Sequence, residues 1–238
     1  MNQEEMMRFG EAPQQALSSA FPVLMRKVYI WMALALVITG VTAYSIASSP
    51  AALEKIYSGS GIMLLLIVVE LGLVFAISAG INRFSLTTAT LLFTLYSVVN
   101  GMTLSYIFLA YTESSIASVF FITAGTFAAM ALFGYLTKTD LSSMGKLLFM
   151  LLIGIIIATI VNFFMRNSML DMLISYAGVA IFVGLTAYDT QKIKQMLMTA
   201  PDAGEHMQKL SLIGALTLYL DFINLFLYLL RIFGNNRK

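Results

Sequence analysis

Apolar residues fill this chain in long runs, and short polar segments separate them. Each run has roughly the 20 residues that a helix needs to cross a hydrocarbon core about 30 Å thick. None alternates with a period of two, and all are too long for barrel strands. The seven runs are Val28–Ala47, Ile62–Gly80, Leu86–Tyr111, Ser115–Thr137, Leu147–Met165, Leu170–Tyr188 and Leu210–Phe233. The pattern predicts an all-α integral membrane protein with seven transmembrane helices.

The arrangement of the runs predicts one membrane domain over residues 28–234. Residues 1–27 are expected to form a cytoplasmic N-terminal segment, and residues 235–238 a short C-terminal tail. The first 25 residues are polar and mixed in charge, without the basic stretch and apolar core of a secretory signal peptide. The first span is therefore expected to serve as its own insertion signal.

Composition supports a membrane protein and narrows the chemistry. Of 238 residues, 59% are hydrophobic and 11% are charged, whereas soluble domains carry about 25% charged residues. The absence of cysteine excludes disulfides and thiolate sites, and a single histidine, His206, argues against histidine-based metal or catalytic sites. A net charge of +2 is too small to indicate nucleic-acid binding. We expect no enzymatic activity, no cofactor and no nucleic-acid partner.

The distribution of Lys and Arg indicates the orientation in the membrane, because cytoplasmic loops carry an excess of both. With a cytoplasmic N-terminus, nine of these residues face the cytoplasm and five face the outside. The nine are Arg8, Arg26, Lys27, Arg83, Lys138, Lys146, Lys192, Lys194 and Lys209, and the five are Lys55, Arg166, Arg231, Arg237 and Lys238. The count favours a cytoplasmic N-terminus. The basic C-terminal end would lie inside instead if the last segment were re-entrant, and this alternative stays open.

Two aspartates stand out at the last two runs: Asp189 in AYDTQKIK, directly after the sixth run, and Asp221 in LYLDFINLFLYLLRIFG, inside the seventh. A charge at the centre of a membrane helix costs about 2.5–3.5 kcal/mol on insertion scales, so such residues are usually functional. We expect a pair that shares one proton, since two anions held close together repel. The alternative is two separate buried acids. Asn224 lies on the helical face of Asp221 and is a plausible partner, whereas Tyr188 is expected to point away from the site.

The pairing makes a geometric demand. Asp189 lies only three residues before Lys192 and should be shallow, whereas Asp221 is about 18 Å along its helix from Lys209. A pair therefore requires either a cavity that dips inwards from the cytoplasm or a seventh helix that begins outside the hydrocarbon.

Other polar residues interrupt the apolar runs. Glu70, in the middle of the second run, is either hydrogen-bonded to a neighbouring helix or a third carboxylate on an ion path with Asp189 and Asp221. Asn100 and Asn162 are expected to form hydrogen bonds between helices.

An intramembrane acid pair is compatible with three classes of function. In a cation path, the carboxylates attract calcium or protons; because calcium prefers six to eight oxygen ligands, Asp189 and Asp221 would make only a weak calcium site. Aspartyl proteolysis is disfavoured, because Leu218–Asp221 departs from the Gly-x-Gly-Asp of presenilin-type proteases. The third class is a non-conducting membrane regulator.

The segments AYDTQKIK and LYLDFINLFLYLLRIFG, with the span count and the third run (VVNGMTLSYIF), resemble the Bax inhibitor-1 family of seven-span proteins. The resemblance covers essentially the whole chain. It implies a central C-terminal helix wrapped by the other six. The aspartates matching Asp189 and Asp221 would be a hydrogen-bonded pair linked to pH-dependent calcium leak. An arginine near the cytoplasmic end of the second span would act as a latch, and Arg83 is the nearest candidate.

These observations together predict a pH-sensitive calcium leak channel of a bacterial inner membrane, gated by the aspartate pair with Arg83 and Asn224. Its partners would be the lipid bilayer and calcium ions. Bacterial members of the family also include regulators of a membrane-bound protease. The alternative is therefore a non-conducting regulator of such a protease or of a stress response. The oligomeric state is left open.

Overall fold

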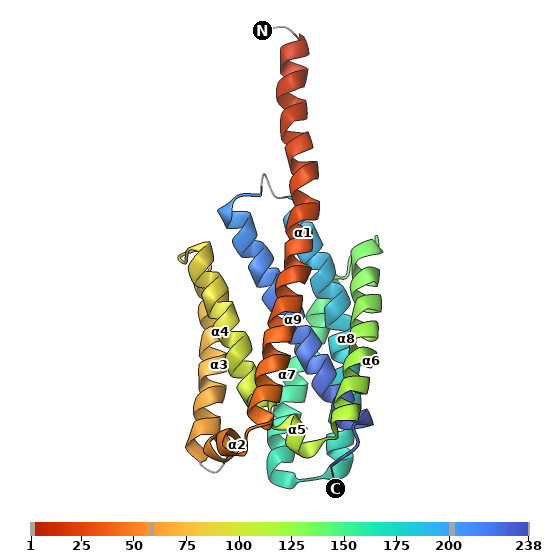
Figure 1. The fold of residues 1–238 in the computed structure, drawn as a ribbon. Helices are drawn as coiled ribbons and strands as arrows, with labels where there is room; N and C mark the ends of the chain where they lie inside the picture. The colour runs from red at the N-terminus through yellow and green to blue at the C-terminus, as the bar shows by residue number, and fades with distance from the viewer. Residues whose placement is uncertain (1–2, 58–59, 200–202, 238) are drawn as a thin grey trace. The chain divides into compact units, whose positions relative to one another are not determined.

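The computed structural model describes residues 3–57, 60–199 and 203–237, which are almost entirely helical (Figure 1). The helices in this part of the chain are α1 (Gln3–Ala47), α2 (Pro50–Tyr57), α3 (Ser60–Gly80), α4 (Leu86–Leu104), α5 (Ile107–Ala110), α6 (Glu113–Leu136), α7 (Ser142–Met165), α8 (Ser168–Met198) and α9 (Glu205–Phe233). Seven segments are long and apolar enough to cross a membrane, with α4 and α5 forming one of them. The predicted all-α membrane protein with seven spans is confirmed.

The helices extend beyond the predicted runs, most of all around the two aspartates. Helix α8 continues to Met198, ten residues past the predicted end of its run, and α9 begins at Glu205, five residues before the predicted start. Helix α1 begins at Gln3, so most of the predicted N-terminal segment is helical. Hydropathy marks only the part of a helix that lies in hydrocarbon, and the polar extensions are helix-compatible sequences that it does not detect.

Helix α9 is the most buried of the spans. In its most apolar stretch 67% of the residues are buried, against 6–44% in the other six. Its fully buried side chains include Leu216, Leu218 and Tyr219. This burial is the property expected of a helix that protein rather than lipid surrounds, in agreement with the predicted central position of the C-terminal helix.

The chain divides into two compact units. The first is drawn from Met1–Leu104 and Ile193–Leu216, and the second from Ser105–Lys192 and Thr217–Lys238. Helices α8 and α9 each contribute to both units. The predicted single domain therefore stays a prediction.

Within the first unit, α4 packs against α1 on one side and α3 on the other. The approach of α4 to α1 is close because Gly101 has no side chain: a Cβ there would lie 2.7 Å from the carbonyl oxygen of Thr39. The Thr39 hydroxyl donates a hydrogen bond to the carbonyl oxygen of Ser97 (2.9 Å). Small and polar residues thus hold these two spans together, as is common in membrane bundles.

Within the second unit, α8 is approached closely by its neighbours at glycines. A Cβ on Gly134 of α6 would collide with the backbone carbonyl of Ala187, and one on Gly184 of α8 would lie 2.7 Å from Leu148. Aromatic rings add packing between α6 and α9, where Phe222 lies 5.4 Å from Phe120, centroid to centroid. These contacts hold α6 and α7 against α8, which carries Asp189, and α6 against the second half of α9, which carries Asp221.

The C-terminal tail lies along the connection between α5 and α6. Tyr111 and Asn236 form an antiparallel β-bridge. The backbone N–H of Thr112 donates to the carbonyl oxygen of Asn235 (3.1 Å), and that of Arg237 donates to Ala110 (2.9 Å). With seven full spans, the tail and this connection, which follows the third span, would lie on the same side of the membrane. The last segment is one unbroken helix of 29 residues and about 43 Å, the length of a full span, which disfavours the re-entrant alternative.

We expect the C-terminus and the α5–α6 connection to react from the same side of the membrane. The chain contains no cysteine, so single cysteines can be introduced without background. Ser114→Cys and Asn236→Cys should react with a membrane-impermeant maleimide from one side, and Thr139→Cys, on the α6–α7 connection, from the other. Labelling of Asn236→Cys together with Thr139→Cys would show that the last segment does not cross.

Candidate functional site

Asp189 of α8 and Asp221 of α9 line the same cavity in the second unit. The cavity has a volume of about 690 Å³. The two carboxyl groups lie within hydrogen-bonding reach of each other. The structure therefore brings together the two residues that the sequence singled out.

The ends of the helices explain how the two aspartates meet. Helix α8 continues for nine residues, about 14 Å, beyond Asp189. Asp221 lies 16 residues, about 24 Å, after the start of α9. Both helices thus extend past their apolar stretches, and neither aspartate lies at the end of its helix. The seventh helix does begin earlier than its apolar run, and both aspartates line one cavity. That the helix begins outside the hydrocarbon, or that the cavity opens to the cytoplasm, stays a prediction.

Asp221 is the more buried member of the pair. Its side chain is 4% exposed, and its Oδ2 atom is buried without a hydrogen-bond partner among the described residues. A buried polar atom left unpaired costs about 1–3 kcal/mol, and more when it is charged. The site is therefore one where the protonation of a carboxyl group, or a positive charge in the cavity, changes the free energy strongly.

Two lysines line the cavity with the aspartates. Lys146 of α7 and Lys192 of α8 are both exposed and bound the same space. The Nζ atom of Lys192 lies 5.8 Å from the centroid of the Tyr188 ring. With both carboxyl groups ionised, the two positive charges would balance them. From the sequence, these lysines served for orientation and Lys192 for the depth of Asp189; the consequence not drawn was that Lys192, three residues after Asp189, lies on the same helical face.

Tyr188 also lines the cavity, so the expectation that it points away from the site is wrong. Its ring packs directly over Gly145 of α7, where a Cβ would overlap the ring. Adjacent residues of a helix differ in direction by about 100°, but the long tyrosine side chain still reaches the cavity edge. The segment just before Asp189 is thus packed against α7 at Gly145 and against α6 at Gly134.

Asn224 lines the cavity one turn beyond Asp221. Its Nδ2 atom donates to the carbonyl oxygen of Leu220 in its own helix (2.8 Å). The amide oxygen remains available to a group in the cavity. The role of Asn224 in gating stays a prediction.

Gln191 is a positioning residue that sequence reasoning did not single out. It is buried two residues after Asp189. Its Oε1 accepts a hydrogen bond from the backbone N–H of Leu141 (2.9 Å), and its Nε2 donates to the carbonyl oxygen of Thr139 (2.8 Å). One amide thereby fixes the α6–α7 connection to α8, at the start of the helix that carries Lys146.

We expect Gln191→Leu to destabilise the protein by about 1–3 kcal/mol, because it leaves the buried N–H of Leu141 without a partner. The thermal unfolding midpoint in detergent measures the effect. Gln195→Leu is the matched control, since Gln195 is exposed one turn further along α8. Equal midpoints for the two variants would contradict the positioning role.

The other two predicted site residues belong to the first unit. Glu70 of α3 accepts a hydrogen bond from the hydroxyl of Thr103 (2.5 Å) and also bonds with the side chain of Asn100, both on α4. This is the hydrogen-bonded alternative considered for Glu70. Arg83 is exposed in the turn that follows α3, where its backbone N–H donates to Gly80 (2.8 Å). The ion path through Glu70 and the latch at Arg83 stay predictions.

A calcium site would have to be built from few protein ligands. Residues 3–57, 60–199 and 203–237 contain no group of three or more acidic or histidine side chains placed to hold a metal ion. The pair supplies two carboxyl groups where calcium takes six to eight oxygens. Weak calcium binding at Asp189 and Asp221 stays a prediction.

Comparison with known proteins gives the family. A family model described as "Inhibitor of apoptosis-promoting Bax1" matches residues 22–238. The inner membrane protein YbhL of Escherichia coli (strain K12) is 50% identical over 215 residues, which cover 90% of this chain and 92% of that protein. An uncharacterized protein of Borreliella burgdorferi is 49% identical over 212 residues, 89% of this chain and 91% of its own. The chain therefore belongs to the Bax inhibitor-1 family, as the two aspartate motifs indicate.

Proposed function

We propose that the protein is a pH-sensitive leak pathway for calcium or another cation, gated by Asp189 and Asp221. The observation that supports this most directly is the meeting of the two carboxyl groups on a cavity inside the membrane-spanning part. We further propose that the protein lies in a bacterial inner membrane, as the name of the Escherichia coli relative states for that protein, with a cytoplasmic N-terminus. It would act without enzymatic chemistry and without a cofactor.

The proposed gate depends on one shared proton. With the proton present, the two carboxyl groups hydrogen-bond and hold α8 against α9. Without it, two like charges about 4 Å apart repel by about 4 kcal/mol at an effective dielectric constant near 20. That energy is comparable to the stability difference between two helix arrangements, so loss of the proton can separate α8 from α9 or rearrange them around Lys146 and Lys192.

Cation passage would use the same cavity. Two carboxylates and the amide oxygen of Asn224 attract a cation, while Lys146 and Lys192 limit how tightly it is held. An ion that keeps most of its water would pass without being stored, as a leak requires.

Calcium flux into proteoliposomes tests the proposal. Purified protein is reconstituted with a calcium-sensitive dye inside the vesicles, and flux is recorded across an acidic-to-alkaline pH series. We expect flux above that of protein-free vesicles, with a change across the series. Flux equal to that of protein-free vesicles at every pH would overturn conduction and favour the alternative, a non-conducting regulator. Co-purification with a membrane-bound protease would then support that alternative.

A further inference from the structure

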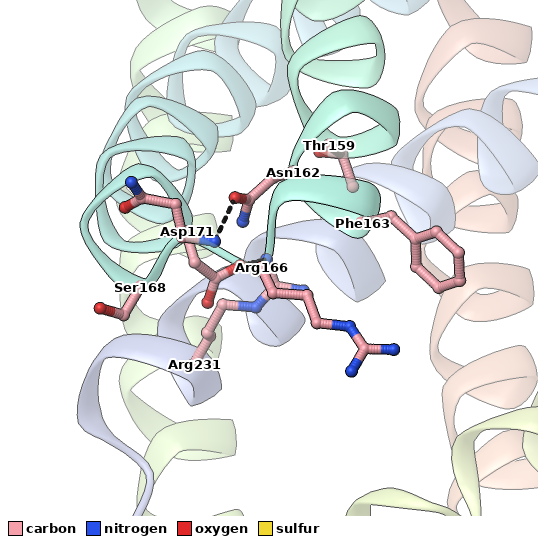
Figure 2. A pocket seen from close by; sticks show the side chains of 8 residues that line it. Thr159, Asn162, Phe163, Arg166, Ser168, Asp171 and Arg231 are labelled. Atoms are coloured by element: carbon pink, nitrogen blue, oxygen red, sulfur yellow. Dashed lines mark hydrogen bonds and ion pairs between the residues drawn. The ribbon is translucent and has the colours of Figure 1, made fainter.

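A second cavity lies where α7 ends and α8 begins, at the end of the second unit that holds the C-terminal tail (Figure 2). Its volume is about 460 Å³. Arg231 of α9, which lines it, follows Asp221 by ten residues, about 15 Å along the helix. The two cavities have no lining residue in common, so this one is separate from the aspartate site.

The turn between α7 and α8 places an arginine at this cavity in a rare backbone conformation. Arg166 is the one non-glycine residue with positive φ (52°) in the described part of the chain. Its backbone N–H caps α7 by donating to the carbonyl oxygen of Asn162 (2.7 Å). A left-handed residue other than glycine, asparagine or aspartate is uncommon, and it persists where the surrounding structure enforces it. The turn thereby makes Arg166 one of the residues that line the cavity, with its guanidinium group on the other side of the turn from Ser168 in Figure 2.

Asn162 supplies a buried polar group. Its side chain is only 8% exposed, and its Oδ1 accepts a hydrogen bond from the backbone N–H of Asn167 (3.0 Å), the dashed line in Figure 2. The expected hydrogen bond from Asn162 to another transmembrane span is therefore replaced by one within the turn. Its Nδ2 donors make no hydrogen bond with any described residue, and they belong to a side chain that lines the cavity.

Positively charged side chains outnumber negatively charged ones at the cavity. Arg231 pairs with Asp171 across 3.3 Å, and both side chains are roughly half exposed. Arg166 makes no ion pair or hydrogen bond through its side chain with the described residues. One positive charge is therefore left over at a cavity that Asn162 and Ser168, in the first turn of α8, also line. Donors and surplus positive charge at a helix N-terminus favour an anion such as phosphate.

One apolar side chain lines the cavity beside its polar residues. Phe163 is 74% exposed, and its sequence neighbour Phe164 and Met169, which follows Ser168, are 78% and 69% exposed. In a transmembrane protein such side chains face acyl chains. A free phosphate ion would use only the polar residues of this cavity, whereas a phospholipid would also cover these apolar side chains.

We propose that this cavity binds the phosphate head group of an anionic phospholipid. The phosphate lies in the cavity that Arg166, Asn162 and Ser168 line, and the acyl chains lie along Phe163. The Asp171–Arg231 ion pair also lines the cavity and leaves Arg166 to neutralise the lipid charge.

Lipid binding to the purified full-length protein tests this proposal. Native mass spectrometry in detergent measures retention of phosphatidylglycerol, of phosphatidylcholine and of inorganic phosphate in separate titrations. We expect phosphatidylglycerol to bind more tightly than phosphatidylcholine, and Arg166→Asn to weaken it about tenfold or more through loss of a charge-assisted contact. Asparagine accepts the left-handed conformation, so this variant keeps the turn, and Arg166→Lys should restore part of the binding.

Lys138→Gln is the matched control, because it removes an exposed positive charge from the opposite end of α6. Equal phosphatidylglycerol binding by wild type and Arg166→Asn would overturn the site. Equal retention of the two lipids would overturn the anionic selectivity. Binding of inorganic phosphate as tight as that of phosphatidylglycerol would replace the lipid by a soluble anion.

Discussion

Asp221→Asn is expected to remove the pH response of cation flux while leaving the protein folded. Asparagine has nearly the shape of a protonated aspartic acid and offers a donor amide in place of the acid hydroxyl, but it cannot ionise. Asp189 can still ionise, but it then faces a neutral amide, so two like charges never meet at any pH. The ratio of flux at the acid and alkaline ends of the series should fall to about 1, since no like-charge repulsion develops. Proteoliposome calcium flux measures this ratio.

Asp189→Asn should have the same effect, because the shared proton belongs to the pair. Asp140→Asn is the control. Ser142, which hydrogen-bonds to Asp140 through its side chain and backbone, holds the pKa of that carboxyl below its ordinary value, so Asp140 stays ionised where the pair is proposed to titrate. The Asp140 variant should retain the wild-type response. A wild-type response in both pair variants would rule the gate out.

Gly134→Ala is expected to be the most destabilising small substitution in the second unit. The added Cβ would collide with the backbone carbonyl of Ala187, and neither group can rotate away as a flexible side chain would. Overpacking usually destabilises by about 1–3 kcal/mol, and we expect the upper end of that range here. The thermal unfolding midpoint of the purified protein in detergent should fall accordingly.

Gly125→Ala on the same helix provides the contrast. A Cβ at Gly125 meets nothing within 4 Å, and alanine favours a helix over glycine by about 1 kcal/mol. This variant should be unchanged or slightly more stable. Because Ala187 lies two residues before Asp189, Gly134→Ala should also alter flux, whereas Gly125→Ala should not. Equal midpoints for the two variants would show that α6 and α8 are not as close as described.

The transmembrane architecture and the aspartate pair were predictable from sequence for physical reasons. Hydrocarbon thickness sets a minimum length for an apolar run, and a carboxyl group within such a run stands out by its insertion cost. Of the cavity lysines, Lys192 could be found from its spacing to Asp189, whereas Lys146 could not, since it falls at the end of a run, where basic residues are ordinary. Gln191 escaped notice because its partners, the backbone groups of Thr139 and Leu141, lie about 50 residues away in sequence.

The C-terminal tail also depends on contacts that no local pattern reveals. Two arginines in RIFGNNRK indicated only a charge, which as an orientation signal opposed the rest of the chain. In the structure, Arg237 donates through its Nη1 atom to the carbonyl oxygen of Phe108 (3.0 Å). The positive charge of Arg237 therefore serves a specific structural contact. This explains why the count of Lys and Arg gave the tail an orientation opposite to that of the rest of the chain.

The pairing of the tail with the α5–α6 connection has a consequence for biosynthesis. Residues 108–112 are made before the fourth span, yet their partners, residues 235–237, follow α9 in sequence. The connection after the third span must therefore wait, without these hydrogen bonds, until α9 and the residues that follow it have been made. Closure of this end of the second unit is thus a late step of assembly, which a chain without residues 235–237 cannot reach.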